Sequence, residues 1–338
     1  MNDAWPLMPS VVALAAAVVV LAFAGTRLAH VADDIAERTG MGKATAGALL
    51  LGGVTSLTGI VTTATGALAG DADFALANPL GGVAIQSVWI AIADLMYRRA
   101  NLEHAAASLP NLLQSMVLVA LLSLPIIAYA TPDLSWGWFH PLTLAIPAFY
   151  FYGLRLLKSV EDAPQWRPRQ TRTTGDEAGE APSAAPLSRL WLAFAGLGAV
   201  VALTGWVVAR AGLGVVAATG IPSGVTGFTI TTAISSLPEL ITLIAAVRMG
   251  SITMGVGNII GGNVFDTLMI AVADLFFLEG SIYANVGPAA PVLLGGTILI
   301  SAVLAVGLVV RDERGIGFEG FAIPGVYAGT VAFAVIAS

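Results

Sequence analysis

Long apolar runs alternate with short polar stretches over almost the whole chain. Each apolar run is roughly 20 residues long, which is the length an α-helix needs to cross the hydrocarbon core of a membrane. The pattern therefore predicts an all-α polytopic membrane protein with ten transmembrane helices. The expected spans are 9–30, 44–68, 73–97, 109–130, 137–157, 189–209, 222–247, 253–278, 289–310 and 319–337.

One long polar stretch separates the fifth span from the sixth, "KSVEDAPQWRPRQTRTTGDEAGEAPSAAP" from Lys158 to Pro186. Prolines, charges and small polar residues in this mixture are typical of a flexible linker. We therefore divide the chain into three parts. They are a first five-helix repeat in the membrane (residues 1–157), a cytoplasmic linker (158–188) and a second five-helix repeat (189–338).

Composition supports the membrane assignment and narrows the chemistry. Of the 338 residues, 57% are hydrophobic and only 11% are charged, whereas a soluble chain carries about a quarter charged residues. There is no cysteine, so disulfides and thiolate chemistry are excluded. No basic stretch precedes the first span, and we expect that span to be a retained helix and not a cleaved signal.

The basic residues predict the orientation. When the loops are assigned alternately to two sides, only Arg210 falls on one side. The other side collects Arg27, Arg38, Lys43, Arg98, Arg99, Arg155, Lys158, Arg167, Arg169, Arg172, Arg189, Arg248, Arg311 and Arg314. By the positive-inside rule that side is cytoplasmic, which places both termini outside and the linker inside. We expect the cell (inner) membrane as the location.

The two halves of the chain repeat each other at a shift of 180 residues. "ANPLGGVAIQSVWIAIADL" from Ala77 aligns without a gap over "GNIIGGNVFDTLMIAVADL" from Gly257, and "VTSLTGIVTTATGALAG" from Val54 over "ISSLPELITLIAAVRMG" from Ile234. The residues that recur are Ser56, Leu57, Thr62, Gly70, Asn78, Gly81, Gly82, Ile90, Ala91, Ala93, Asp94 and Leu95. Each repeat has five helices, so the second must enter the membrane from the opposite face. Secondary transporters are built on this inverted plan, with their sites at the midplane.

An acidic residue lies inside one of the apolar runs, "TTAISSLPELITLIAAVRMG" from Thr231 to Gly250. A carboxylate in hydrocarbon is unfavourable by roughly 2.5–3.5 kcal/mol on insertion scales, so Glu239 needs a function. The adjacent Pro238 removes a backbone hydrogen bond and predicts a break in the helix, with a carbonyl near Ile234 freed to face a cavity. The alternatives are a purely structural kink at Pro238 and a protonated Glu239 that bonds to a neighbouring helix.

The motifs "SSLPEL" and "GNIIGGNVFD" resemble the second α-repeat of the sodium/calcium exchanger (cation/Ca²⁺ antiporter) superfamily. The repeats of that family read roughly G-T-S-L-P-E and G-N-x-x-G-S-N-x-x-N/D. The positions that match are Ser235, Ser236, Pro238, Glu239, Asn258, Gly261, Asn263 and Asp266. The resemblance implies ten helices in two inverted repeats and secondary-active exchange of Ca²⁺, or another cation, against Na⁺ or H⁺ by alternating access.

The residue types agree with a site for a hard cation, which takes six to eight oxygen ligands at roughly 2.3–2.6 Å. Glu239 and Asp266 supply carboxylates. Hydroxyl oxygens come from Thr55, Ser56, Ser235 and Ser236, and amide carbonyls from Asn78, Gln86, Asn258 and Asn263. The two asparagines Asn78 and Asn258 have a purely structural bonding role as their alternative. We expect inorganic cations and the lipid bilayer as partners, with no cofactor and no nucleic acid.

The first repeat departs from the family pattern. Gly59 stands at the family's glutamate position, Thr58 at its proline position and Gln86 at its last Asn/Asp position. Two carboxylates neutralise one Ca²⁺, but several simultaneous Na⁺ ions would be harder to hold. The sequence therefore leaves the ion, the stoichiometry and the oligomeric state open. A monovalent cation/proton exchanger and a transport-impaired relative with a scaffold role remain alternatives.

Two further acidic residues, Asp94 and Asp274, occupy equivalent positions near the C-terminal ends of their helices, which the inversion places towards the cytoplasmic face for Asp94 and the outer face for Asp274. We predict vestibule carboxylates that attract cations or relay protons; the alternative is that each pairs with a neighbour or reaches the interface. As an aspartyl protease pair they would lie too far apart to share a proton. The histidines, His30, His104 and His140, lie away from any serine nucleophile, and no phosphate-binding glycine loop with lysine is present. We therefore expect a transporter and not an enzyme.

Overall fold

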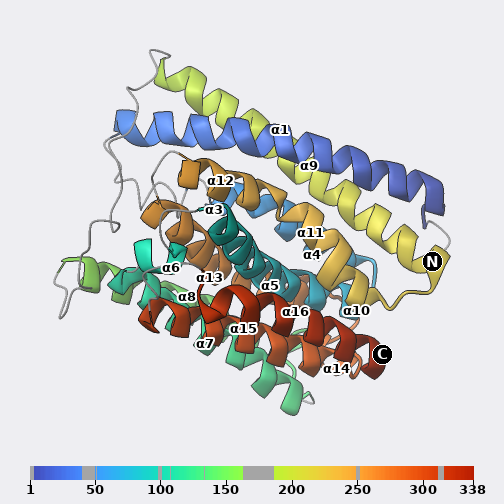
Figure 1. Ribbon diagram of the computed structural model, residues 1–338. Helices are drawn as coiled ribbons and strands as arrows, with labels where there is room; N and C mark the ends of the chain where they lie inside the picture. Colours follow the sequence, from blue (N-terminus) through green and yellow to red (C-terminus); the bar gives the residue numbers. More distant parts are fainter. Residues whose placement is uncertain are drawn as a thin grey trace.

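The computed structural model describes residues 4–39, 50, 52–97, 101–106, 108–132, 134–162, 186–248, 252–310 and 316–338. Within these ranges the chain is helical apart from turns and one isolated bridge between Trp136 and Phe139. The helices pack into one bundle, with α1 and α9 side by side along one face (Figure 1). The predicted linker lies almost wholly outside the described residues.

Each half of the chain contributes the same order of helices. The first half contains α1 (Leu7–Thr39), α3 (Gly52–Thr55), α4 (Leu57–Leu68), α5 (Ala72–Met96), α6 (Leu102–Ala105), α7 (Leu109–Ala130) and α8 (Leu142–Asp162). The second contains α9 (Leu187–Thr219), α10 (Ser223–Thr226), the π-helix η2 (Gly227–Thr231), α11 (Thr232–Ser235), α12 (Leu237–Arg248), α13 (Ile252–Phe276), α14 (Ile282–Asn285), α15 (Ala290–Val310) and α16 (Phe318–Ala337).

These helices follow the predicted spans in order, and they confirm an all-helical, multi-span membrane protein. Seven of the described helices are long and apolar enough to cross a membrane, and α10–α12 forms an eighth span that is bent by 45°. The segments α3–α4 and α8 occupy the second and fifth predicted positions. Both α1 and α9 reach 33 residues, which is longer than predicted; α1 continues past its apolar run, and α9 continues past Arg210 through a further apolar stretch.

The two halves run in opposite directions through the bundle. Ser10, near the start of α1, lies against Gly214, near the end of α9, where a Cβ atom on that glycine would collide with the Ser10 hydroxyl. Likewise Gly70, just before α5, lies against Glu279, just after α13. Elements of the first repeat therefore begin where their counterparts in the second repeat end, as the predicted inversion requires.

Two glycines let a long helix of one half touch the broken helix of the other. A Cβ atom on Gly25 of α1 would lie 2.9 Å from Cα of Pro238, and one on Gly205 of α9 would lie 2.5 Å from the Thr58 carbonyl oxygen. Gly25 and Gly205 are equivalent in the 180-residue register, as are Thr58 and Pro238. Close backbone approach at small residues is how helices pack in lipid.

The second and seventh spans are both interrupted at an equivalent serine. Ser236 separates α11 from α12 with φ −92° and ψ 11°, where the following Pro238 cannot donate a backbone hydrogen bond. Ser56 separates α3 from α4 although no proline follows it. The sequence predicted the second break but not the first. The helices α5 and α13 cross beside these breaks, with 89% and 67% of their spans buried, so the breaks face the centre of the protein.

Candidate functional site

The carboxylate of Asp266 lies at the centre of the bundle and receives hydrogen bonds from the first repeat. Ser56, at the break between α3 and α4, donates its hydroxyl to Oδ1 at 2.7 Å, and Gln86 of α5 donates Nε2 to Oδ2 at 2.7 Å. Asp266 is buried, with 2% of its surface exposed. A residue of the second repeat is thus held by two residues that the sequence predicted for the first-repeat wall.

Glu239 lies in the first turn of α12, directly after the break at Ser236. It is buried (4% exposed), and the Thr55 side chain forms a hydrogen bond with its carboxyl group. Its other oxygen, Oε2, has no hydrogen-bond donor among the described residues. The break therefore places a carboxylate oxygen at the protein centre with no hydrogen bond to stabilise it.

Glu239 and Asp266 line one small cavity of about 10 Å³, between the two broken helices and the crossing of α5 and α13. A cavity needs roughly 10–15 Å³ to hold one water-sized particle. The cavity is lined by Gly59, Asn78, Pro79, Gly82, Gln86, Ser235, Ser236, Glu239, Asp266 and Met269. It brings together the two predicted carboxylates and half of the predicted neutral polar residues, Asn78, Gln86, Ser235 and Ser236.

Two oxygen atoms of residues that line this cavity are acceptors without a donor in the part of the chain that the structure describes, Gln86 Oε1 and Glu239 Oε2. Buried polar atoms are rarely left unsatisfied, and each such atom needs an explanation such as a water or an ion. Acceptors that converge without donors form an environment suited to a cation.

The remaining predicted residues divide into two groups. Ser235 and Ser236 line the cavity, but the Ser235 hydroxyl already donates to the Thr232 carbonyl at 3.3 Å. Asn78 also lines it, although its amide donates to the Gly59 carbonyl at 3.2 Å and to Thr63 at 2.9 Å. These bonds make Asn78 a link between α4 and α5, which favours the structural alternative for it.

Asn258 and Asn263 do not line the cavity. The Asn258 amide lies 3.5 Å from the Thr242 hydroxyl, and the Asn263 amide donates to Ser87 of α5 at 3.3 Å. The Asn263 bond links α13 to α5. The carbonyl oxygens of Asn258 and Asn263 both lack a donor among the described residues, and a ligand role for each stays a prediction.

The first repeat supplies no carboxylate to the cavity, and the Met269 side chain fills the space beside Gly59. A Cβ atom on Gly59 would lie 3.0 Å from both Sδ and Cε of Met269. The sequence drew attention to Gly59 but not to Met269, because a methionine in an apolar helix carries no chemical signal. Among the described residues, no group of three or more His, Cys, Asp and Glu side chains lies close enough to hold a metal ion.

Asp94 and Asp274 are buried and bond to loops at opposite ends of the protein. Asp94 accepts the Leu102 N–H at 2.6 Å, and Asp274 accepts the Ile282 N–H at 2.7 Å. Each bond spans eight residues and anchors the short helix, α6 or α14, that follows. Asp274 also accepts from the His140 N–H at 2.8 Å and from the Thr143 hydroxyl. These bonds favour the alternative of pairing with a neighbour over the vestibule role.

The sequence also missed a polar hollow at the start of α5, which α9 and the segment after α13 also line. It has a volume of about 500 Å³, and its lining includes Asp71, Asp73, Arg210 and Glu279. Asp71 caps α5 through the Phe74 N–H at 2.9 Å and accepts the Ser223 hydroxyl at 2.8 Å. These acidic residues lie at or beyond helix ends, where charge is unremarkable in a sequence, so only the fold shows that they converge.

The inverted five-helix halves, the paired broken helices and the buried carboxylates at their crossing define a secondary transporter. A family model described as sodium/calcium exchanger protein matches residues 9–157 and 188–336, which is most of the chain. The chain belongs to this family of membrane cation antiporters, and it is therefore a transporter and not an enzyme.

Solved structures of exchangers share the fold. The H⁺/Ca²⁺ exchanger CAX superposes with a TM-score of 0.68 at 15% identity, over 99% of this chain and 87% of that one. The sodium-calcium exchanger NCX_Mj, soaked with 100 mM Na⁺ and 10 mM Sr²⁺, gives 0.61 at 18% identity over 96% and 98%. With 2.5 mM Na⁺ and 0.1 mM Ca²⁺ it gives 0.61 at 18% identity over 97% and 99%. At such identities the likeness concerns the fold alone.

Proposed function

We propose that this chain is a secondary-active antiporter that binds one Ca²⁺, or another divalent cation, between Glu239 and Asp266 and exchanges it against Na⁺ or H⁺. The observation that carries the proposal is the buried cavity between the broken helices, where two carboxylates and the donor-free Gln86 Oε1 converge. Two negative charges balance one divalent ion. The surrounding oxygens are of the type that Ca²⁺ prefers.

The same two carboxylates explain why transport would be coupled. When the divalent cation leaves, two charges remain in a buried environment, and an uncompensated buried charge is strongly unfavourable. Protons or sodium ions must then neutralise Glu239 and Asp266 before the unloaded protein can change its access. The Ser56 and Gln86 hydrogen bonds hold the Asp266 carboxylate in place during this exchange of ions.

Alternating access follows from the inverted halves. The cavity lies between elements that are related by the 180-residue register, so an arrangement that opens it to one face has a counterpart that opens it to the other. The long helices α1 and α9 each contact the broken helix of the opposite half, through Gly25 and Gly205. A movement of this pair relative to the rest would therefore act on both breaks together.

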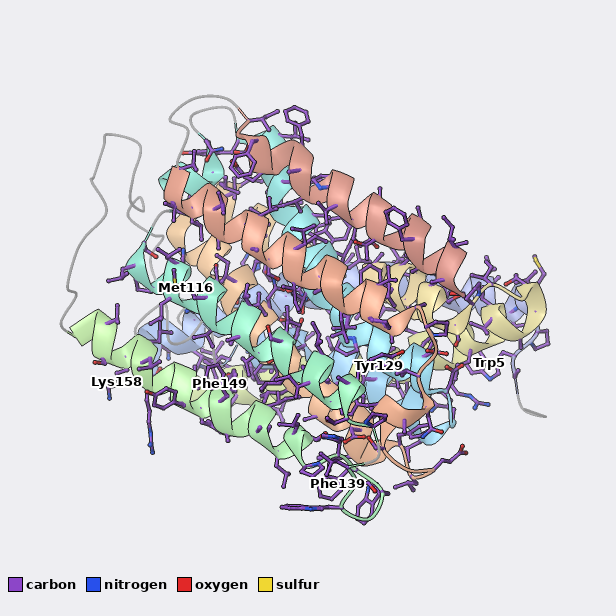
Figure 2. All side chains as sticks on the ribbon, turned by 90° about the horizontal axis from the view of Figure 1, so that it is seen from below. Trp5, Met116, Tyr129, Phe139, Phe149 and Lys158 are labelled. Carbon is purple, nitrogen blue, oxygen red and sulfur yellow. The ribbon has the colours of Figure 1, made fainter. Side chains whose placement is uncertain are left out.

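We further propose that the N- and C-termini lie outside the cell and the linker inside. Figure 2 shows Lys158 at one end of α8, and Phe139 in the loop beyond its other end, on the same side as Trp5. Basic residues concentrate on the Lys158 side in the sequence, as expected of a cytoplasmic face. Trp136 and Trp138 are exposed beside Phe139, where an aromatic belt is expected.

The test is cation flux in reconstituted vesicles, with Ca²⁺, Na⁺, K⁺ and H⁺ gradients applied separately. We expect Glu239→Gln to abolish cation-coupled flux, because the amide removes one of the two charges while it keeps the shape of the side chain. Glu279→Gln is the matched control, since Glu279 is an exposed glutamate on a loop outside the cavity. Equal flux in both variants and the wild type would refute the ligand role of Glu239.

The missing carboxylate at Gly59 supports a second candidate function, a monovalent cation/proton exchanger. A site with two carboxylates also balances one monovalent cation together with one proton, and the first repeat adds no third carboxylate. The same vesicles distinguish the two, because this alternative predicts Na⁺ or K⁺ flux driven by a pH gradient with no effect of Ca²⁺. A transport-impaired scaffold predicts no flux under any gradient.

A further inference from the structure

A methionine of α13 occupies the place where the first repeat lacks its carboxylate. Met269 lies three residues after Asp266, so both side chains project from one face of the helix. It is buried (3% exposed) and lines the same cavity as Glu239 and Asp266. Its Sδ and Cε atoms are the nearest neighbours that a Cβ atom on Gly59 would meet, both at 3.0 Å.

The 180-residue register shows which side chain the contact between Met269 and Gly59 replaces. Gly59 is the counterpart of Glu239, so a side chain at position 59 would enter the cavity from α4 as Glu239 enters it from α12. The thioether of Met269 fills that space instead. A thioether is a weak acceptor and a soft ligand, whereas Ca²⁺, Mg²⁺ and similar hard cations take oxygen. The first-repeat side of the cavity therefore presents an apolar group where its counterpart presents a charge.

The remaining volume agrees with this assignment. The cavity holds about 10 Å³, which is room for roughly one water-sized particle. Methionine is unbranched and flexible, so it fills irregular gaps closely. A second ion would need both the space that Met269 occupies and a negative charge that Gly59 does not supply.

We infer that Met269 is a specificity-determining residue: its thioether fills the first-repeat half of the cavity and limits the site to a single cation, held by Glu239 and Asp266. The identity of the cargo rests on the proposed function. The packing of Met269 against Gly59 does not rest on the proposed function. Separate measurements test the packing and the cation binding.

The first measurement is thermal unfolding of the full-length protein in detergent. We expect Gly59→Glu to lower the midpoint by roughly 5 °C, because the new side chain collides with Met269 and buries a charge. Adding Met269→Ala should restore most of the loss. Gly59→Glu with Met116→Ala is the matched control, since Met116 is an exposed methionine on α7, outside the cavity.

A second control uses a different glycine of α4. A Cβ atom on Gly66 would lie 2.5 Å from the Phe74 ring, so Gly66→Ala should also destabilise the protein. Because Met269 is not part of that contact, Met269→Ala should not restore it. Rescue of Gly59→Glu by Met116→Ala, rescue of Gly66→Ala by Met269→Ala, or no rescue of Gly59→Glu by Met269→Ala would each overturn the inference.

The second measurement is isothermal titration of Ca²⁺ into the same proteins. We expect one ion per chain in the wild type, and about tenfold tighter binding in Gly59→Glu/Met269→Ala, since a further carboxylate raises the affinity of an oxygen site for Ca²⁺. Tighter binding in the double variant supports the inference even where the wild type binds no Ca²⁺, a result that would refute the proposed function alone. Unchanged or absent binding in a stable double variant would overturn the role of Met269.

Discussion

A substitution at Asp274 is the clearest way to distinguish a structural role of a buried carboxylate from a role in transport. Its two oxygens accept three hydrogen bonds, from the Ile282 N–H at 2.7 Å, the His140 N–H at 2.8 Å and the Thr143 hydroxyl. These donors come from the loop after α13 and from the segment that leads into α8. In Asp274→Asn, whichever way the side chain is turned, its NH₂ group faces donors on one side and cannot accept their hydrogen bonds.

The expected loss follows from these bonds. Hydrogen bonds to a charged group contribute about 1.5–3 kcal/mol each. At least one is lost in Asp274→Asn and the others become neutral, so we expect destabilisation by roughly 2–4 kcal/mol. Asp94→Asn is the matched control, since Asp94 holds the equivalent position but has one such bond among the described residues, from Leu102 at 2.6 Å. An asparagine keeps that bond by presenting its carbonyl, so the expected loss is at most about 1 kcal/mol.

The assay is thermal unfolding of both variants in detergent, followed by cation flux in vesicles that contain equal amounts of folded protein. We expect a large midpoint shift for Asp274→Asn, a small one for Asp94→Asn, and wild-type flux per folded molecule for both. A shift for Asp274→Asn that does not exceed the one for Asp94→Asn would refute the anchoring role. A selective loss of flux in stable protein would instead support the predicted vestibule.

Two further outcomes test the packing and the site. Gly205→Ala should destabilise the protein by about 1–3 kcal/mol in thermal unfolding, because its Cβ would lie 2.5 Å from the Thr58 carbonyl; Gly196→Ala, on the open side of the same helix, should have no such effect. Gln86→Leu should weaken Ca²⁺ binding about 10- to 100-fold by titration, since it removes the donor that orients Asp266. Unchanged affinity would show that this hydrogen bond does not position the ligand.

The helix order and the inversion could be predicted from the sequence because both follow from patterns that are visible along the chain. Apolar runs fix the spans, and the matching residues at a spacing of 180 fix the relation between halves. The break at Pro238 was equally local, since proline lacks a donor. The break at Ser56 was not, because Thr58 follows in place of proline. Its cause lies in distant partners, the α9 backbone at Gly205 and the Asp266 carboxylate.

The candidate site was predicted in its charged residues and less well in its neutral ones. Glu239 and Asp266 were identifiable because charge in an apolar run is rare. The ligand role of Asn263, assigned by its motif position, stays a prediction, and the motif did not report that its amide donates to Ser87. Met269 was missed since apolar residues in a helix look alike until their neighbours are known. Hydrogen bonds of Asp274 to His140 and Thr143 span more than a hundred residues, which no local pattern reports.

The contacts of α1 with Pro238 and of α9 with Thr58 bear on how the two repeats diverged. A substitution at Gly25 is constrained by a residue of the opposite repeat, and so is one at Gly205. Neither repeat could then drift alone, because each change is selected against a surface encoded in the other repeat. Gly59 and Met269 fit this pattern, because a missing side chain in one repeat is matched by a bulky side chain in the other. The duplicated halves would have evolved like two interacting proteins, through compensating changes across a shared interface.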